Sequence, residues 1–113
     1  MKNIKSRLLA PANTPYAVTL FGTDVFIRRL SAEELSEFED KGAEFSGQGN
    51  TRPMMLAASS FVLSALVDEK GVPEQDLPSP TELMKVHSYA SITEAMSIVQ
   101  RHSYGTLEEA KKN

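Results

Sequence analysis

Two histidines are the side chains of this 113-residue chain best suited to acid–base or metal chemistry. His87 and His102 fall on different predicted helices, and neither belongs to the His-Glu-x-x-His pattern that sets two ligands on one helical face. The chain has no cysteine, which excludes a thiolate zinc site, a disulfide and a cysteine nucleophile. Because a lone helical histidine is more commonly a partly buried structural residue, we expect no metal site.

The serines and glycines do not complete a catalytic or nucleotide-binding motif. Ser59-Ser60, Ser88 and Ser103 lack the glycine frame of a nucleophile elbow. Gly47-Gln48-Gly49 continues neither into a dinucleotide-binding fingerprint nor into the lysine of a P-loop. We therefore predict that the chain is not an enzyme and holds no cofactor.

Charge and hydropathy also exclude two classes of partner. The net charge is −3, there is no tryptophan and the other aromatic residues are dispersed, so no nucleic-acid surface is predicted. No apolar run approaches the roughly 20 residues of a membrane span. The acidic residues 33–40 could bind a cation, but on a capped helix they more simply form a solvated face.

A β-hairpin is the clearest local structure that could position a binding surface. Residues 16–20 alternate in the period of a strand, Gly22-Thr23 suits a type II′ turn, and residues 24–29 form the second strand. This turn predicts two opposed pairs on one apolar face, Leu20 with Val25 and Val18 with Ile27.

The other face of the hairpin is predicted to carry Phe21, Phe26 and Arg28. Arg28 and Arg29 point to opposite faces, so one of them can pair with the acidic helix that follows. Exposed Phe21 and Phe26, or the free edges of a two-stranded ribbon, would favour self-association, and a homo-oligomer is therefore a possible state.

A capped helix follows the hairpin directly. Ser31 and Glu34 have the spacing of a capping box, and Leu30 and Leu35 occupy the positions of a hydrophobic staple. Gly42 is the predicted stop signal. A flexible loop rich in Gly, Ser and Asn is then expected over residues 43–52.

The next segment, residues 53–67, is apolar nearly all round and should form the central buried helix, with Thr51 as its cap. Residues 61–67 fit a helix or a strand equally well, because a short apolar run does not decide between them. Residues 68–71, Asp-Glu-Lys-Gly, predict a turn.

Capping boxes also mark the C-terminal helices. Ser79 to Glu82 and Ser91 to Glu94 each predict a helix start, and Thr106 to Glu109 could open a last turn within a C-terminal tail over 106–113. At the other end, residues 1–14 form a basic arm with a short helix that Pro11 ends.

The expected fold is therefore a single α+β domain over residues 1–113, with an N-terminal β-hairpin packed on a small bundle of about four helices.

The order of these segments resembles the small tail assembly chaperones of long, non-contractile-tailed bacteriophages, the lambda-like siphophages and their relatives. The two most telling pieces are VFIRRLSAEELSEFE over residues 25–39 and LVDEKG over residues 66–71. Val72-Pro73 departs from the aromatic residue that relatives often carry there, so the fold of residues 72–79 stays open.

The resemblance implies a late, non-structural protein of the host cell cytoplasm that is absent from the mature virion. Such proteins bind the long helical tape-measure protein, keep it soluble and help to recruit the major tail protein. The family also implies a longer product made by a programmed frameshift near the end of the reading frame, where Lys111-Lys112 would suit a slippery run of adenines.

A partner helix with an apolar stripe would need an apolar groove with a charged rim. We predict that groove between the central helix and the C-terminal helices, with Met54, Met55, Met84 and Met96 as adaptable contacts. The alternative for Met54 and Met55 is gap-filling in the core.

Two other functions remain open: a tail-completion or head–tail joining component retained in the virion, and a small regulatory adaptor.

Overall fold

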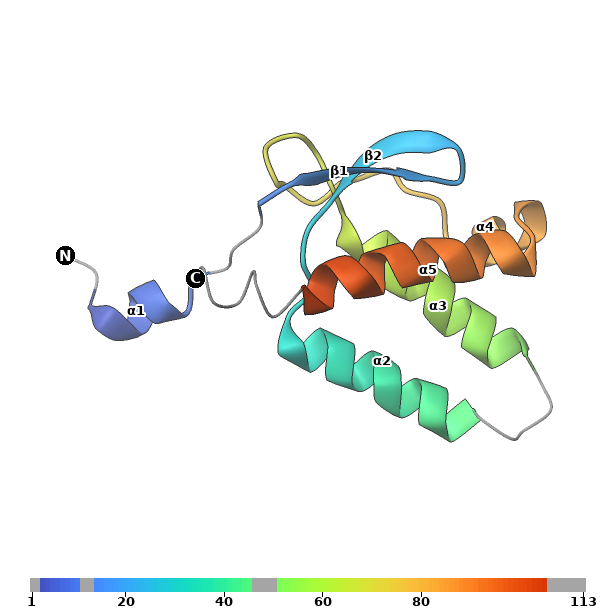
Figure 1. The fold of residues 1–113 in the computed structure, drawn as a ribbon, viewed down its shortest axis with the longest axis horizontal. Coiled ribbons are helices and arrows are strands. Elements are labelled where there is room, and N and C mark those ends of the chain that lie inside the picture. Colours follow the sequence, from blue (N-terminus) through green and yellow to red (C-terminus); the bar gives the residue numbers. More distant parts are fainter. Residues whose placement is uncertain (1–2, 11–13, 46–50, 106–113) are drawn as a thin grey trace.

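The computed structural model describes residues 3–10, 14–45 and 51–105, and their elements are shown in Figure 1. The predicted tail over 106–113, with its Thr106 cap, lies outside the described residues, as does the centre of the 43–52 loop. In chain order the elements are α1 (Ile4–Leu8), β1 (Tyr16–Leu20), β2 (Thr23–Ile27), α2 (Ala32–Phe45), α3 (Arg52–Ala65), β3 (Leu66–Val67), α4 (Pro80–Val86) and α5 (Tyr89–Tyr104).

The sheet has three strands in the order β1-β2-β3, all antiparallel, so the predicted two-stranded ribbon was incomplete. The ambiguous segment 61–67 divides between both alternatives, because α3 ends at Ala65 and Leu66–Val67 then pair with the end of β2. The short third strand covers part of the β2 edge that would otherwise be free. Residues 72–74 return beside it, since Val67 bridges to Pro73 and the Glu74 amide donates to the Leu66 carbonyl.

The hairpin turn lies one residue earlier than predicted, at Phe21-Gly22 instead of Gly22-Thr23. Both residues have positive φ, 53° and 72°, as a type I′ turn requires, whereas a type II′ turn needs it only at the first position. Val18 consequently pairs with Val25, and Leu20 with Thr23. This register differs from the predicted one by two residues, so every side chain keeps its face and the apolar face stays intact.

The capping box of α2 is confirmed. The Glu34 amide donates to the Ser31 hydroxyl at 3.2 Å, and the Ser31 amide donates to Glu34 Oε1 at 2.8 Å. Leu30 and Leu35 are both buried on either side of it. The predicted stop at Gly42 is wrong, because α2 continues to Phe45. Glycine inside a helix costs only about 1 kcal/mol and does not by itself end one.

The box at Ser79 is confirmed at the start of α4, but the predicted start of α5 at Ser91 is wrong. Ser88 is the N-cap, and its hydroxyl accepts the Ser91 amide at 3.1 Å. Serine is a good cap at either position, and the earlier one allows three more helical residues. Gly105 ends the helix with a φ of 70°.

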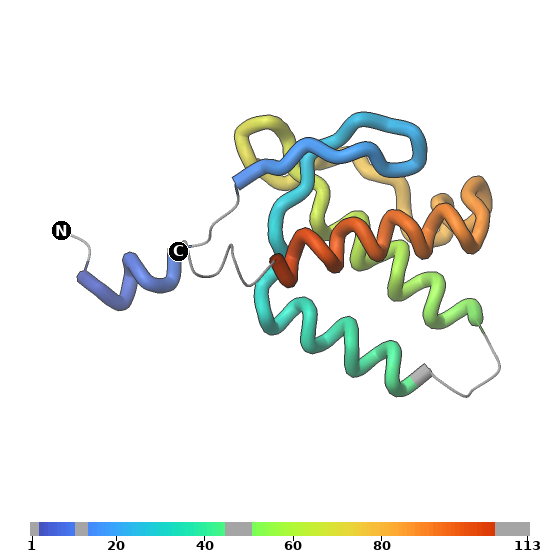
Figure 2. Tube along the Cα trace, in the orientation of Figure 1, coloured from blue at the N-terminus to red at the C-terminus, as the bar shows by residue number. Residues whose placement is uncertain are grey.

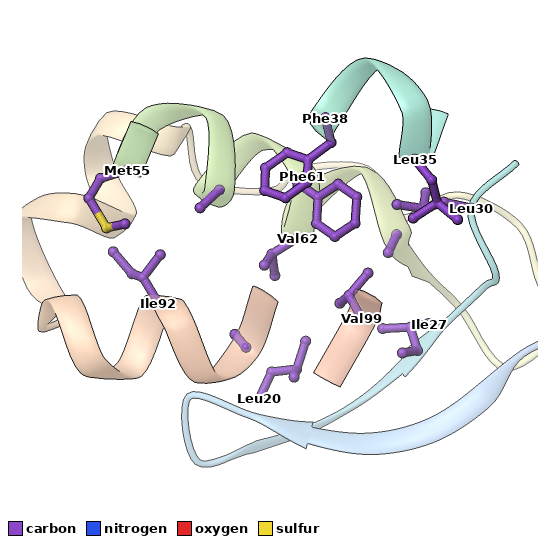
Figure 3. Packing of buried hydrophobic residues seen from close by; sticks show 13 residues of the cluster. Leu20, Ile27, Leu30, Leu35, Phe38, Met55, Phe61, Val62, Ile92 and Val99 are labelled. Atoms are coloured by element: carbon purple, nitrogen blue, oxygen red, sulfur yellow. The ribbon is translucent and has the colours of Figure 1, made fainter. Parts of the chain in front are cut away.

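The core forms around α3, which packs against α2, α4 and α5. In Figure 3, Leu20 and Ile27 of the hairpin and Ile92 and Val99 of α5 gather around Val62. Phe61 stacks on Phe38 of α2, with ring centroids 4.1 Å apart. The α+β architecture with a hairpin packed on helices is therefore as predicted.

Candidate interaction surfaces

Both histidines stack on aromatic rings of the hairpin. His102 lies 4.2 Å from the ring of Tyr16, and His87 lies 4.2 Å from the ring of Phe21. These stacks attach the two ends of β1 to the C-terminal helices, so both histidines have a structural role. Within 3–10, 14–45 and 51–105, no group of three or more acidic or histidine side chains could hold a metal ion.

Two of the candidate serines have structural roles. Ser88 caps α5, and the Ser103 hydroxyl accepts the Leu30 amide at 3.0 Å, which fixes the end of α5 to the start of α2. Ser59 is fully buried on α3, and its hydroxyl has no hydrogen-bond partner in the described part of the chain.

Of the two arginines expected to include a partner of the acidic helix, Arg28 contacts it, and its guanidinium donates two hydrogen bonds of 3.0 and 2.8 Å to Glu34. The same guanidinium donates to the Ser64 carbonyl at 3.0 Å. Because the Arg28 amide also donates to the Ala65 carbonyl, this one residue joins β2, α2 and the end of α3.

The pKa values of the pair follow from this geometry. The hydrogen bond from Arg28 lowers the pKa of Glu34 to about 2, against a smaller opposing effect of burial and with help from the Ser31 amide. The hydrogen bond to Glu34 raises the pKa of Arg28. The carboxylate is thus engaged in anchoring the hairpin and is not free for acid–base chemistry near neutral pH.

The predicted methionine contacts come from three helices that pack together, but they are unequally accessible. Met55 is buried at 7% exposure in the core, where it fills space between α3 and α5 (Figure 3). Met54 on α3, Met84 on α4 and Met96 on α5 are half-buried and pack against the core with part of their surface open. A partner could touch these three without unfolding the domain.

The corner between α4 and α5 exposes two large apolar side chains that the sequence argument did not select. Val86, the last residue of α4, is 77% exposed, and Tyr89, the first residue of α5, is 60% exposed. They lie within five positions of Met84. The available signal was Ser88, because a cap at this position places Val86 and Tyr89 on either side of the break between the two helices.

An open groove of about 390 Å³ lies over the β2–β3 end of the sheet. We call it the acidic groove; its lining includes Asp24, Phe26, Leu66, Glu69, Glu74 and Leu77. Phe26 and Leu66 are half-buried there and Leu77 is 37% exposed, so an apolar floor has an acidic rim. Phe21, the other predicted contact, lies instead in the hairpin turn against His87.

No described helix has the length and apolar character that crossing a membrane requires.

A family model described as "Phage tail assembly chaperone protein, TAC" matches residues 3–113 of the chain. No curated protein and no solved structure matches it.

Proposed function

Because the chain belongs to the family of phage tail assembly chaperone proteins, we propose that it binds the tape-measure protein, keeps it soluble and helps to recruit the major tail protein. The observation that carries this proposal is the match itself, which spans the domain from α1 to the C-terminal end of the chain. The proposed role is non-catalytic. It is exercised in the host cell cytoplasm, and the protein does not remain in the mature virion.

The structure supplies a surface that suits such a partner. Val86 and Tyr89 are exposed at the α4–α5 corner, and half-buried Met84 and Met96 belong to the same two helices. Thioether side chains adapt to different apolar shapes, and tyrosine adds a large contact area at low entropic cost. We propose that an apolar stripe of the tape-measure protein packs against this exposed corner.

Co-expression with the tape-measure protein tests the function. That protein should aggregate alone, and it should stay soluble and co-purify in the presence of this chain. If the wild-type chain changes neither solubility nor association, the proposed partner is wrong. Mass spectrometry of purified particles is the second arm, because recovery of the chain in virions would favour a tail-completion or joining component.

A paired substitution tests the surface. Val86→Ser with Tyr89→Ser removes the two most exposed apolar groups of the corner, and we expect about tenfold weaker retention of the tape-measure protein. Tyr104→Ser is the matched control, since Tyr104 is 55% exposed at the opposite end of α5. Equal loss in both variants, or in neither, would remove the corner from the proposal.

The longer frameshifted product stays a proposal as well. The codons for Lys111 and Lys112 decide it, because a slippery sequence there is required and synonymous changes that remove the slip should abolish any longer product while leaving this chain intact.

A further inference from the structure

The acidic groove lies on the face of the sheet that points away from the core. Asp24 and Phe26 alternate along β2 with Val25 and Ile27, and Ile27 is fully buried in the core. Because successive side chains of a strand point to opposite faces, Asp24 and Phe26 face away from the core. Figure 1 shows α2, α3 and α5 on one side of the hairpin, so the groove on the other face is open to another molecule.

The wall of the groove is a turn that hydrogen bonds hold in place. Asp68 Oδ1 accepts the amides of Lys70 and Val72 at 2.8 and 3.0 Å, and the Asp68 amide donates to the Val72 carbonyl at 2.8 Å. The chain then returns beside β3, where the Glu74 amide donates to the Leu66 carbonyl at 3.1 Å. A docking partner would therefore meet a surface that is already formed, which lowers the entropic cost of binding.

The groove carries charge of one sign. Its lining holds four carboxylates and, within the described part of the chain, no lysine, arginine or histidine. Two of the four are already engaged, because Asp24 accepts the Thr19 hydroxyl at 2.9 Å and Asp68 holds the turn. Glu69 and Glu74 are exposed, and neither has a side-chain partner among the described residues. The groove therefore offers two carboxylates to the cations of another molecule.

These two carboxylates share the groove with an apolar floor. Glu74 is held beside Leu66, and Glu69 follows Leu66 by three positions, a span of at most about 10 Å. Phe26, Leu66 and Leu77 supply the apolar surface. An extended segment matches this layout when basic residues alternate with apolar ones, because positions two and four apart on a strand are about 7 and 14 Å apart.

We propose that the acidic groove is a second docking site, which takes a short basic segment of a partner protein with apolar residues between its lysines or arginines. The apolar side chains pack on Phe26 and Leu77, and the basic side chains pair with Glu69 and Glu74. None of these four residues belongs to the α4–α5 corner. A chain with two separate surfaces can hold two partner segments at once, and failure of this site would leave the proposed function untouched.

Fluorescence anisotropy with a labelled peptide tests the site on the full chain. The probe is Gly-Ser-Lys-Leu-Lys-Leu-Lys-Ser-Gly, which should bind the wild type with a dissociation constant of about 100 µM, as suits a small interface. Glu69→Lys with Glu74→Lys should weaken binding at least about tenfold. Glu39→Lys with Asp40→Lys on α2 makes the same change in net charge elsewhere. At about 150 mM salt, where screening acts over about 8 Å, this control should change the affinity less than about twofold.

The floor is tested from both sides of the contact. A peptide with serine in place of leucine should bind about tenfold more weakly, and Leu77→Ser should weaken binding of the original peptide about threefold, because both remove buried apolar area. Circular dichroism should show the same helix content in every variant, since all the substituted side chains are exposed. No binding to the wild type, full binding of the serine peptide, or equal loss in the groove and α2 variants would overturn the proposal.

One competing occupant is on the chain itself. The helix α1 carries Lys5 and Arg7 beside exposed Ile4 and Leu8, and it lies apart from the body of the domain in Figure 2. If α1 of the same or another copy fills the groove, Lys5→Ser with Arg7→Ser should free it and tighten binding of the peptide about tenfold, which would overturn the proposal. Unchanged affinity in this variant supports a partner from outside the chain.

Discussion

The ion pair between Arg28 and Glu34 should stabilise the attachment of the hairpin to the helices by a measurable and pH-dependent amount. A fall in the pKa of Glu34 from 4.5 to about 2 would correspond to roughly 3 kcal/mol if no solvent screened the pair. The Glu34 side chain is 37% exposed, however, and exposed pairs contribute at most about 1 kcal/mol. Because the pair is doubly hydrogen-bonded and Arg28 is only 18% exposed, we expect about 1 kcal/mol.

A double-mutant cycle measures this coupling. Arg28→Met removes the guanidinium, and Glu34→Gln removes the charge while keeping an oxygen that can accept the Ser31 amide. We expect the free energy of unfolding in urea to fall by about 2 kcal/mol in the first variant, which also loses the Ser64 contact, and by about 1 kcal/mol in the second.

The pH dependence has a definite sign. Folding lowers the pKa of Glu34, so the stabilisation is fully present above about pH 4.5 and is lost as the pH falls through about 2. The coupling should therefore be equal at pH 7 and pH 5 and smaller at pH 3. Arg101→Met, which removes an exposed arginine that donates to a carbonyl of its own helix, should change stability by less than about 0.5 kcal/mol. A coupling near zero at pH 7, or one unchanged at pH 3, would refute the reasoning.

Three further substitutions test the packing by urea unfolding at pH 7. Ser59→Ala should stabilise the domain by about 1 kcal/mol, because it removes a fully buried hydroxyl without a described partner; a loss of stability would show that the hydroxyl is satisfied. Ile92→Ala should cost about 3 kcal/mol, since this side chain is 1% exposed at the centre of the core, and a cost below about 1 kcal/mol would contradict the packing in Figure 3. Gly22→Ala should cost about 1 kcal/mol although there is space for its Cβ, because φ is 72°; no change would argue against the type I′ turn.

Structural features that depend only on residues close together in the sequence could be predicted from the sequence. The capping boxes at Ser31 and Ser79 depend on residues three positions apart, and both are confirmed. The alternation of Val18, Leu20 and Ile27 places these side chains on the core face whichever of the two turns forms, because the two registers differ by two residues.

Where two local solutions were close in free energy, tertiary contacts decided between them. Phe21 can take a left-handed conformation in the turn because its ring stacks on His87, a residue 66 positions away in the chain.

Ser88 instead of Ser91 begins α5, and α2 continues past Gly42, although Tyr89, Ala90, Ala43 and Glu44 are exposed. These residues extend helices that have already formed, and such an extension costs little because each added residue brings its own helical hydrogen bond.

The sequence by itself determined the fold class and the family resemblance, because these follow from local patterns and from residue types. Tertiary structure alone decided which surfaces are free. Met55 and Met54 are adjacent in the chain, yet one is in the core and the other is partly open. The acidic groove joins Phe26 to Glu74 across β3, a strand that exists only because Leu66 and Val67 find an edge of the sheet to pair with.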